Sequence, residues 1–170
     1  DWWHYAENER FVSVFIGDVT GHGVPAALLT SAVHAACVVA GRFAQLTPSQ
    51  YLAVINDALF SAVRGKMMMT FFIAQIDKVT GILTYSLASH EPPMLLRFSV
   101  KDIGKGDYIF LHEHNNRRLG EVYNETFKEN QVQLSKGDRI FLYTDGVYDV
   151  QSPDGQELGE RRFTKFLSNA

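Results

Sequence analysis

Two aspartates in this 170-residue chain stand beside glycine, each after a short apolar run. Asp18 lies in the segment 11–24, FVSVFIGDVTGHGV, and Asp145 follows the run RIFLY at 139–143. Runs this rich in Val, Ile, Leu and Phe favour buried strands. Carboxylates placed close together at two strand ends would repel each other unless cations lay between them. Because hard oxygen ligands suit Mg²⁺ and Mn²⁺, the pattern predicts a metal centre.

The first of these aspartates opens a glycine-rich turn. Phe11–Ile16 is predicted to be a central strand buried on both faces. The following Gly21-His22-Gly23 provides a backbone that can turn tightly and approach a ligand closely. His22 is a candidate proton donor to a leaving oxygen, and a hydrogen bond within the loop is its alternative role. For Asp18, capping the next helix is the structural alternative to binding a metal.

Two helices are predicted directly after the turn. Pro25–Val39 is apolar nearly all round, which is typical of a buried or sandwiched helix, and Gly41 is its expected end. In the second helix, Pro48–Arg64, Thr47 and Gln50 can form a capping box. We expect the two helices to pack as a pair beside the acidic turn. The surplus apolar surface of the first meets either the second helix or another protein surface.

Strand patterns fill most of the remaining chain, and an amphipathic helix follows them. A strand, an acidic turn and a buried helix in succession first suggest an α/β sheet. The predicted strands are Asp1–Tyr5, Met69–Asp77, Gly81–Ala88, Met94–Phe98, Tyr108–His112, Thr126–Leu134 and Arg139–Tyr143, with an exposed loop at Ser99–Asp107 and a helix at Leu158–Leu167.

Composition limits the class of protein. The length predicts one domain, 1–170, and the 46% hydrophobic content is ample for a core. A net charge of -3 argues against a nucleic-acid partner, and so against a metal-dependent nuclease. No apolar run reaches the roughly 18–20 uninterrupted residues of a membrane span, so no direct membrane contact is expected. The single cysteine, Cys37, fits a reducing compartment, so a cytoplasmic location is expected.

Five segments, in this order, resemble SpoIIE-type (RsbU-like) serine phosphatases of the metal-dependent protein phosphatase (PPM) superfamily. They are GDVTGHGVPAALL at 17–29, MTFFIAQID at 69–77, ASHEPP at 88–93, LSKGDRIFLYTDGVYD at 134–149 and GQELGERRF at 155–163. The resemblance covers essentially the whole chain. It implies an α+β fold, a four-layer α/β/β/α sandwich of two mostly antiparallel sheets flanked by helix pairs, in place of the α/β sheet.

The resemblance also implies a two-metal centre, with Mn²⁺ or Mg²⁺, at the edge of the sandwich. Asp18 matches the aspartate that bridges both metals, and the Val19 carbonyl matches a backbone ligand. Asp145 matches a ligand of one metal, and Asp1 matches the aspartate of the family's opening Gly-Gly-Asp-aromatic motif. The catalytic residues would be Asp18, Asp145 and His22.

The implied activity is metal-assisted hydrolysis of phosphoserine or phosphothreonine on a protein. Metal ions would make hydroxide available near neutral pH, so no side-chain nucleophile is needed. The implied substrate is a phosphorylated anti-sigma-factor antagonist. An upstream sensor domain would dock on the helix pair at 25–64, through which the chain could also form a homodimer. The alternative is a non-catalytic phosphatase-like module that binds a partner through the same face.

Three departures from the family pattern bear on these expectations. The two glycines expected before Asp1 are missing, and the usual Ala-Gly-His-Asn-Pro turn reads ASHEP at 88–92. The family's final strand, with an Asp-Asp or Asp-Asn pair that supplies another ligand, has no counterpart before Ala170. The chain is therefore expected to be a fragment without its terminal strands, holding one metal weakly.

Overall fold

The computed structural model describes residues 1–43, 45–98 and 108–167. The chain divides into two compact units, each with its own β-sheet. The first unit comprises Asp1–His90 and Glu113–Leu134, and the second comprises Glu91–His112 and Ser135–Ala170. The exposed loop expected at 99–107 lies outside the described residues.

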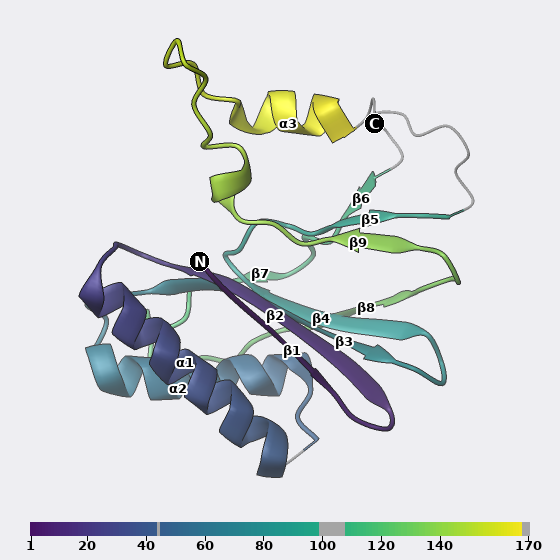
Figure 1. Cartoon of the computed structure of the whole chain (residues 1–170). Coiled ribbons are helices and arrows are strands. Elements are labelled where there is room, and N and C mark those ends of the chain that lie inside the picture. Colours follow the sequence, from purple (N-terminus) through teal and green to yellow (C-terminus); the bar gives the residue numbers. More distant parts are fainter. Residues whose placement is uncertain (44, 99–107, 168–170) are drawn as a thin grey trace. The chain divides into compact units, whose positions relative to one another are not determined.

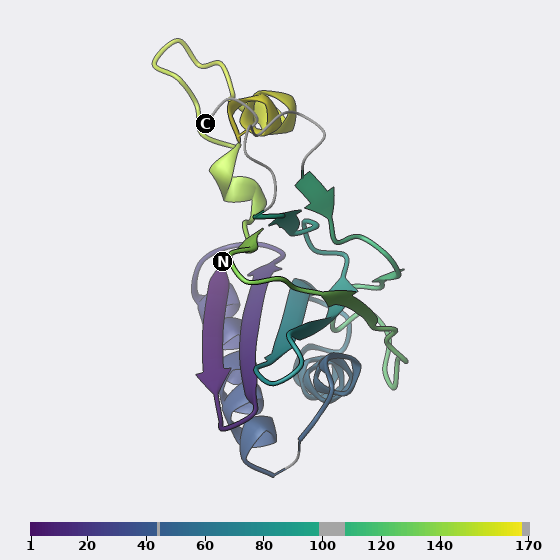
Figure 2. The same cartoon turned by 90° about the vertical axis from the view of Figure 1, so that its right-hand side faces the viewer.

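A six-stranded sheet forms the frame of the first unit (Figure 1). Its order is β1-β2-β3-β4-β7, and β8 also pairs with β4. All pairs are antiparallel except that between β4 and β7. The strands are β1 (Trp2–Glu7), β2 (Phe11–Val19), β3 (Met69–Asp77), β4 (Ile82–Ala88), β7 (Asn115–Asn116) and β8 (Asn130–Gln133). In this sheet β1 is an edge strand, and β2 lies between β1 and β3 (Figure 2).

The strand β2 is central but has one buried and one half-buried face. Burial alternates along it, as the two-residue period of a strand requires, so the expected burial of Phe11–Ile16 on both faces is wrong. The strand also continues to Val19, so Asp18 is the second-last residue of the strand instead of following it. The buried positions are Ser13, Phe15, Gly17 and Val19.

Two helices, α1 (Val24–Phe43) and α2 (Pro48–Val63), lie side by side on one face of this sheet (Figures 1 and 2). The predicted capping interaction of α2 is confirmed, because the Thr47 N–H donates to Gln50 Oε1 at 2.9 Å. The predicted end of α1 is wrong, because Gly41 lies inside the helix. Burial of the neighbouring Ala40 and Tyr51 indicates that packing outweighs the low helix propensity of glycine there.

The helix α1 has more apolar surface than the sheet covers. A stripe at helical spacing is buried: Ala26, Leu29, Val33, Cys37 and Ala40. On other faces Leu28 is 67% exposed and Val39 is 53% exposed. Contrary to the sequence-based expectation, Val24–Arg42 is long and apolar enough to cross a membrane, by length and composition alone. Core helices of soluble proteins pass the same test, so this evidence is weak.

The predicted hairpin between β3 and β4 is confirmed. It closes at Gly81, whose φ of 70° suits glycine. Within the turn, Asp77 Oδ1 accepts hydrogen bonds from the N–H groups of Val79 and Thr80. Arg10 donates to Asp77 Oδ2 through two nitrogens. The backbone N–H groups and the Arg10 guanidinium lower the pKa of Asp77, although burial opposes them. The bonds from Arg10, directly before β2, attach the hairpin to the start of that strand.

The second unit is built on a three-stranded antiparallel sheet in the order β6-β5-β9. Its elements are β5 (Met94–Leu96), β6 (Tyr108–Phe110), β9 (Arg139–Phe141), the short 3₁₀ helix η1 (Asp145–Val147) and the helix α3 (Gly159–Leu167). The strands are shorter than predicted. Before β9, Asp138 accepts hydrogen bonds from Arg97 and from the Ser135 and Phe98 N–H groups. Burial opposes its ionisation, but these donors lower its pKa.

The fold is therefore α+β, with two mostly antiparallel sheets, as the resemblance implied. Among the described residues the first unit holds a helix pair, and the second holds α3 and η1. The assignment of 1–170 to one domain stays a prediction.

Candidate metal centre

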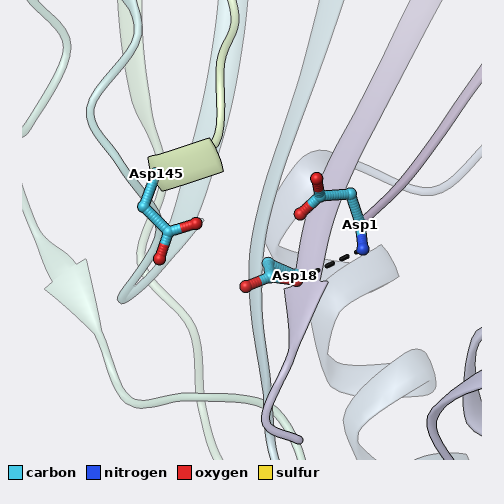
Figure 3. Close-up of side chains that lie close together, drawn as sticks. All are labelled: Asp1, Asp18 and Asp145. Carbon is cyan, nitrogen blue, oxygen red and sulfur yellow. Dashed lines mark ion pairs between the residues drawn. The ribbon is translucent and has the colours of Figure 1, made fainter. Parts of the chain in front are cut away.

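Two of the predicted metal ligands lie together at one end of the first sheet. Trp2 pairs with Gly17 in the β1–β2 ladder, so the preceding Asp1 comes beside Asp18. A carboxylate oxygen of each lies within 4.8 Å of the other. Figure 3 shows both side chains at this sheet edge. Both carboxylates reach solvent, since the Asp18 side chain is 32% exposed and that of Asp1 is 60% exposed.

The two carboxylates lie close enough together to attract a cation. The α-ammonium nitrogen of Asp1 is 3.3 Å from Asp18 Oδ1, and the dashed line in Figure 3 marks this ion pair. Two neighbouring carboxylates without a cation would repel each other. A carboxylate pair of this kind is stabilised by a bound cation, and its oxygen donors fit the preference of Mg²⁺ and Mn²⁺.

The turn after Asp18 is firmly attached to the neighbouring strand. The Thr20 N–H donates to the Met68 carbonyl at 2.9 Å, and the Thr20 hydroxyl both donates to that carbonyl and accepts from the Met68 N–H. Val19 is buried just before this anchor. The predicted tight turn is confirmed by Gly21 and Gly23, whose φ angles of 94° and 80° favour glycine.

His22 is exposed between these two glycines. The roles predicted for it, proton donor or loop hydrogen-bonding group, both stay predictions. The same holds for the carbonyl of Val19 as a metal ligand.

The remaining predicted ligand, Asp145, belongs to the second unit. It begins η1, where its carbonyl accepts hydrogen bonds from the N–H groups of Tyr148 and Asp149, at 2.9 and 3.0 Å. Figure 3 also shows its side chain, which is exposed. Asp145 thus follows a short strand, as predicted, but its place beside Asp18 stays a prediction.

Two tyrosines near Asp145 lie among carboxylates of the same unit. Burial, with the charges of Glu91 and Glu160, raises the pKa of Tyr143 to about 12. Burial, a hydrogen bond with Glu91 and the charges of Glu91, Asp145 and Glu160 raise the pKa of Tyr148 well above its ordinary value. Both phenols therefore stay protonated at neutral pH, and the hydroxyl proton of Tyr148 is donated to Glu91.

Behind Asp18 the structure places residues that the sequence did not identify as functional. Thr70 lies opposite Asp18 in the β2–β3 ladder, and its hydroxyl donates to the Asp18 carbonyl at 3.4 Å. The buried His90 ring lies on the other side of this hydroxyl, with Nδ1 at 3.0 Å. The only sequence signal was the ASHEPP motif, in which His90 stands beside an unusual serine.

That serine explains one departure from the family pattern. Ser89 has a φ of 52°, in the left-handed region that favours the glycine of the usual motif. Its N–H donates to Asn115 Oδ1 at 2.8 Å, and its hydroxyl donates to the Asn116 carbonyl at 2.9 Å. The side-chain hydrogen bond therefore offsets strain that glycine would not have.

We expect Ser89→Ala to lower the free energy of unfolding by about 1 kcal/mol, because it keeps the strained φ and loses the hydroxyl hydrogen bond. Ser89→Gly should stay within about 0.5 kcal/mol of the unchanged chain, since relief of strain offsets that lost bond. Urea unfolding of the three proteins measures both values. A glycine variant less stable than the alanine variant would contradict this account.

Comparison with solved structures defines the class of the fold. The SiaA-PP2C domain of Pseudomonas aeruginosa matches with a TM-score of 0.80 and 23% identity, over 99% of this chain and 65% of that one. The structure of the RsbU and RsbW domains of Rv1364c from Mycobacterium tuberculosis matches with a TM-score of 0.78 and 25% identity, over 97% of this chain and 43% of that one. The fold is that of PP2C-type phosphatase domains.

Sequence comparison then gives the family. The family model for Stage II sporulation protein E (SpoIIE) matches residues 8–170, so the chain belongs to the SpoIIE family. Phosphoserine phosphatase RsbU of Bacillus subtilis (strain 168) is 30% identical over 155 residues, which are 91% of this chain and 44% of RsbU. The chain thus spans less than half the length of this relative.

Two more distant structures of the same fold contain divalent metals. The catalytic domain of the serine threonine protein phosphatase PstP, in complex with 2 manganese ions, has a TM-score of 0.56 and 17% identity, over 98% of this chain and 84% of that one. RsbX in complex with magnesium has a TM-score of 0.67 and 16% identity, over 89% and 68%. At these identities the likeness is one of fold.

Proposed function

We propose that this chain is the catalytic part of a metal-dependent protein serine/threonine phosphatase that acts in bacterial signalling. The observation that carries the proposal is the Asp1–Asp18 carboxylate pair in a chain of the SpoIIE family. The identity with a phosphoserine phosphatase supports the same reaction.

The proposed metal ligands are the carboxylates of Asp1, Asp18 and Asp145 and the backbone carbonyl of Val19. An all-oxygen set with three negative charges suits Mn²⁺ or Mg²⁺, and the proposed centre holds two ions, as the family resemblance implies. Metal-bound structures of the same fold agree with a divalent ion. Bound metal would supply acidity for water near neutral pH and positive charge for phosphoryl oxygens.

The chain's own residues would then hold the metal ligands in position and protonate the leaving group. Asp18 lies near the end of a strand that is paired on both sides, so its carboxylate is held in a fixed position at that end of the sheet. His22, exposed in the adjoining turn, is the proposed proton donor to the leaving serine oxygen. No side-chain nucleophile is needed in this scheme.

The proposed substrate is phosphoserine on a small regulatory protein of the anti-sigma-factor-antagonist type, in the cytoplasm. Its partners would include an upstream sensor domain, and a second copy of the chain could share the same surface. The exposed apolar residues of α1, such as Leu28 and Val39, support docking on the helix pair 25–64.

The test is a single-turnover phosphate-release assay of the chain on a phosphoserine protein. We expect release with Mn²⁺ or Mg²⁺, loss of at least about 100-fold in excess EDTA, and recovery when Mn²⁺ is restored. Glu9→Gln, an exposed substitution in the β1–β2 turn, is a control that should keep full activity. Release that persists in EDTA would overturn the metal-dependent mechanism.

A further inference from the structure

We propose that His90 is a positioning residue that acts through Thr70 on the strand end carrying Asp18. The inference rests on the proposed metal site, since its effect is on how well Asp18 is presented to a metal ion. All the residues that it uses belong to the first unit.

The hydrogen bonds run in one direction from the histidine to the strand. Thr70 Oγ1 donates to the Asp18 carbonyl at 3.4 Å, and His90 Nδ1 lies 3.0 Å from the same oxygen. A hydroxyl has one proton to donate, so in the proposed arrangement, in which Thr70 donates to Asp18, its oxygen accepts from His90 Nδ1–H. This places a proton on Nδ1 of the imidazole. His90 is 4% exposed, so solvent hardly competes for the contact.

The contact can act on Asp18 because the two strands are packed tightly there. Thr70 is the residue opposite Asp18 in the β2–β3 register. At the preceding position, a Cβ added to Gly17 would lie 2.6 Å from a Phe71 ring carbon and 2.7 Å from the Thr70 carbonyl. Without slack between the strands, the position of Thr70 determines that of the Asp18 backbone.

The histidine itself is held by a strained and well-bonded turn. Ser89, with its φ of 52°, is fixed by hydrogen bonds to Asn115 and Asn116. A parallel bridge also joins Ser89 to Phe71 on β3. Strain of this kind persists where the surrounding structure specifies it, and it directs the His90 ring toward Thr70. The turn, the ring and the hydroxyl thus form one support behind the sheet edge.

The consequence is preorganisation of a metal ligand. Groups that hydrogen-bond to ligating residues fix their orientation, and their removal commonly weakens metal affinity by about 10–100-fold. Here the bond reaches the backbone of Asp18 rather than its carboxylate, so we expect a smaller change, of about three- to tenfold.

The test measures Mn²⁺ affinity by electron paramagnetic resonance, together with stability by urea unfolding, on the 170-residue chain. Thr70→Val removes the hydroxyl with little change of shape and should weaken Mn²⁺ binding about three- to tenfold. Thr70→Ser keeps the hydroxyl and should restore the original affinity. His90→Ala should weaken binding by a similar factor, and adding it to Thr70→Val should weaken binding no further.

Ser86→Ala is the matched control for a purely structural effect. Ser86 is fully buried on β4, and its hydroxyl donates to the Lys128 carbonyl at 2.7 Å. The variant should lose stability as Thr70→Val does but keep the original Mn²⁺ affinity. The inference is overturned if Thr70→Val lowers stability without weakening Mn²⁺ binding. It is also overturned if the effects of the His90 and Thr70 substitutions on Mn²⁺ affinity are additive. If the proposed metal site itself were wrong, Asp18→Asn would also keep the original Mn²⁺ affinity. This variant therefore distinguishes failure of the inference from failure of the metal site.

Discussion

Replacing Asp18 by Asn should weaken Mn²⁺ binding by about 100-fold or more while the fold survives. Loss of a directly ligating charge should cost at least as much affinity as loss of a supporting hydrogen bond. Stability should change by less than about 1 kcal/mol, because an exposed ion pair contributes little and removal of one carboxylate also relieves repulsion. Isothermal calorimetry with Mn²⁺, and urea unfolding without metal, measure the two effects.

The same substitution chemistry at Glu9 provides the control. Glu9→Gln also removes one negative charge from the first unit, in the exposed turn between β1 and β2. It should leave Mn²⁺ affinity within about a factor of two, because a single exposed charge distant from the metal is largely screened by salt. Unchanged Mn²⁺ affinity in Asp18→Asn would show that the metal site was assigned to the wrong carboxylates.

Gly17→Ala should lower the free energy of unfolding by about 3 kcal/mol or more. The added Cβ would lie 2.6 Å from a ring carbon of Phe71, 2.7 Å from the Thr70 carbonyl and 2.8 Å from the methyl carbon of Met69. Phe71 and Met69 are fully buried, and the carbonyl belongs to a paired strand. None of the three can move away without disturbing the core, so overpacking is unavoidable.

Gly41→Ala makes the same chemical change in α1 and should have a small effect. Among the described residues, an added Cβ there meets the Tyr51 hydroxyl alone, at 3.3 Å, and alanine favours the helix. Urea unfolding should place this variant within about 1 kcal/mol of the unchanged chain. Similar stabilities for the Gly17 and Gly41 variants would show that β2 and β3 are packed less closely than described.

Local signals in the sequence predicted the elements that lead to the site. Apolar runs rich in Val, Ile and Phe identified β2 and β3, glycine identified the 21–23 turn, and Thr47 with Gln50 identified the start of α2. These features depend on residues within a few positions of one another. The same local rules misplaced the end of α1, because burial, which depends on distant residues, keeps Gly41 helical.

The site itself was predicted only in part. Asp18 was identified from its place beside glycine after an apolar run, and Asp1 only through the resemblance; their adjacency follows from strand pairing. The contact of His90 with Thr70 joins residues 20 positions apart, and that of Thr70 with Asp18 joins residues 52 positions apart. No local pattern encodes such contacts, so they appear only once β2 and β3 are in register. The φ of Ser89 likewise depends on its partners at Asn115 and Asn116.

Because β1 lies at the edge of the sheet and β2 inside it, the carboxylates of Asp1 and Asp18 should keep their positions for different lengths of time. β2 is paired with β3 along its full length and with β1 along most of it, so its amide hydrogens should exchange with solvent only when the unit unfolds. β1 is an edge strand that begins directly after Asp1, and edge strands open at much lower free energy than central ones. Brief separation of β1 would therefore remove one carboxylate while Asp18 stays in place, giving a metal ion a route of departure that leaves the sheet intact.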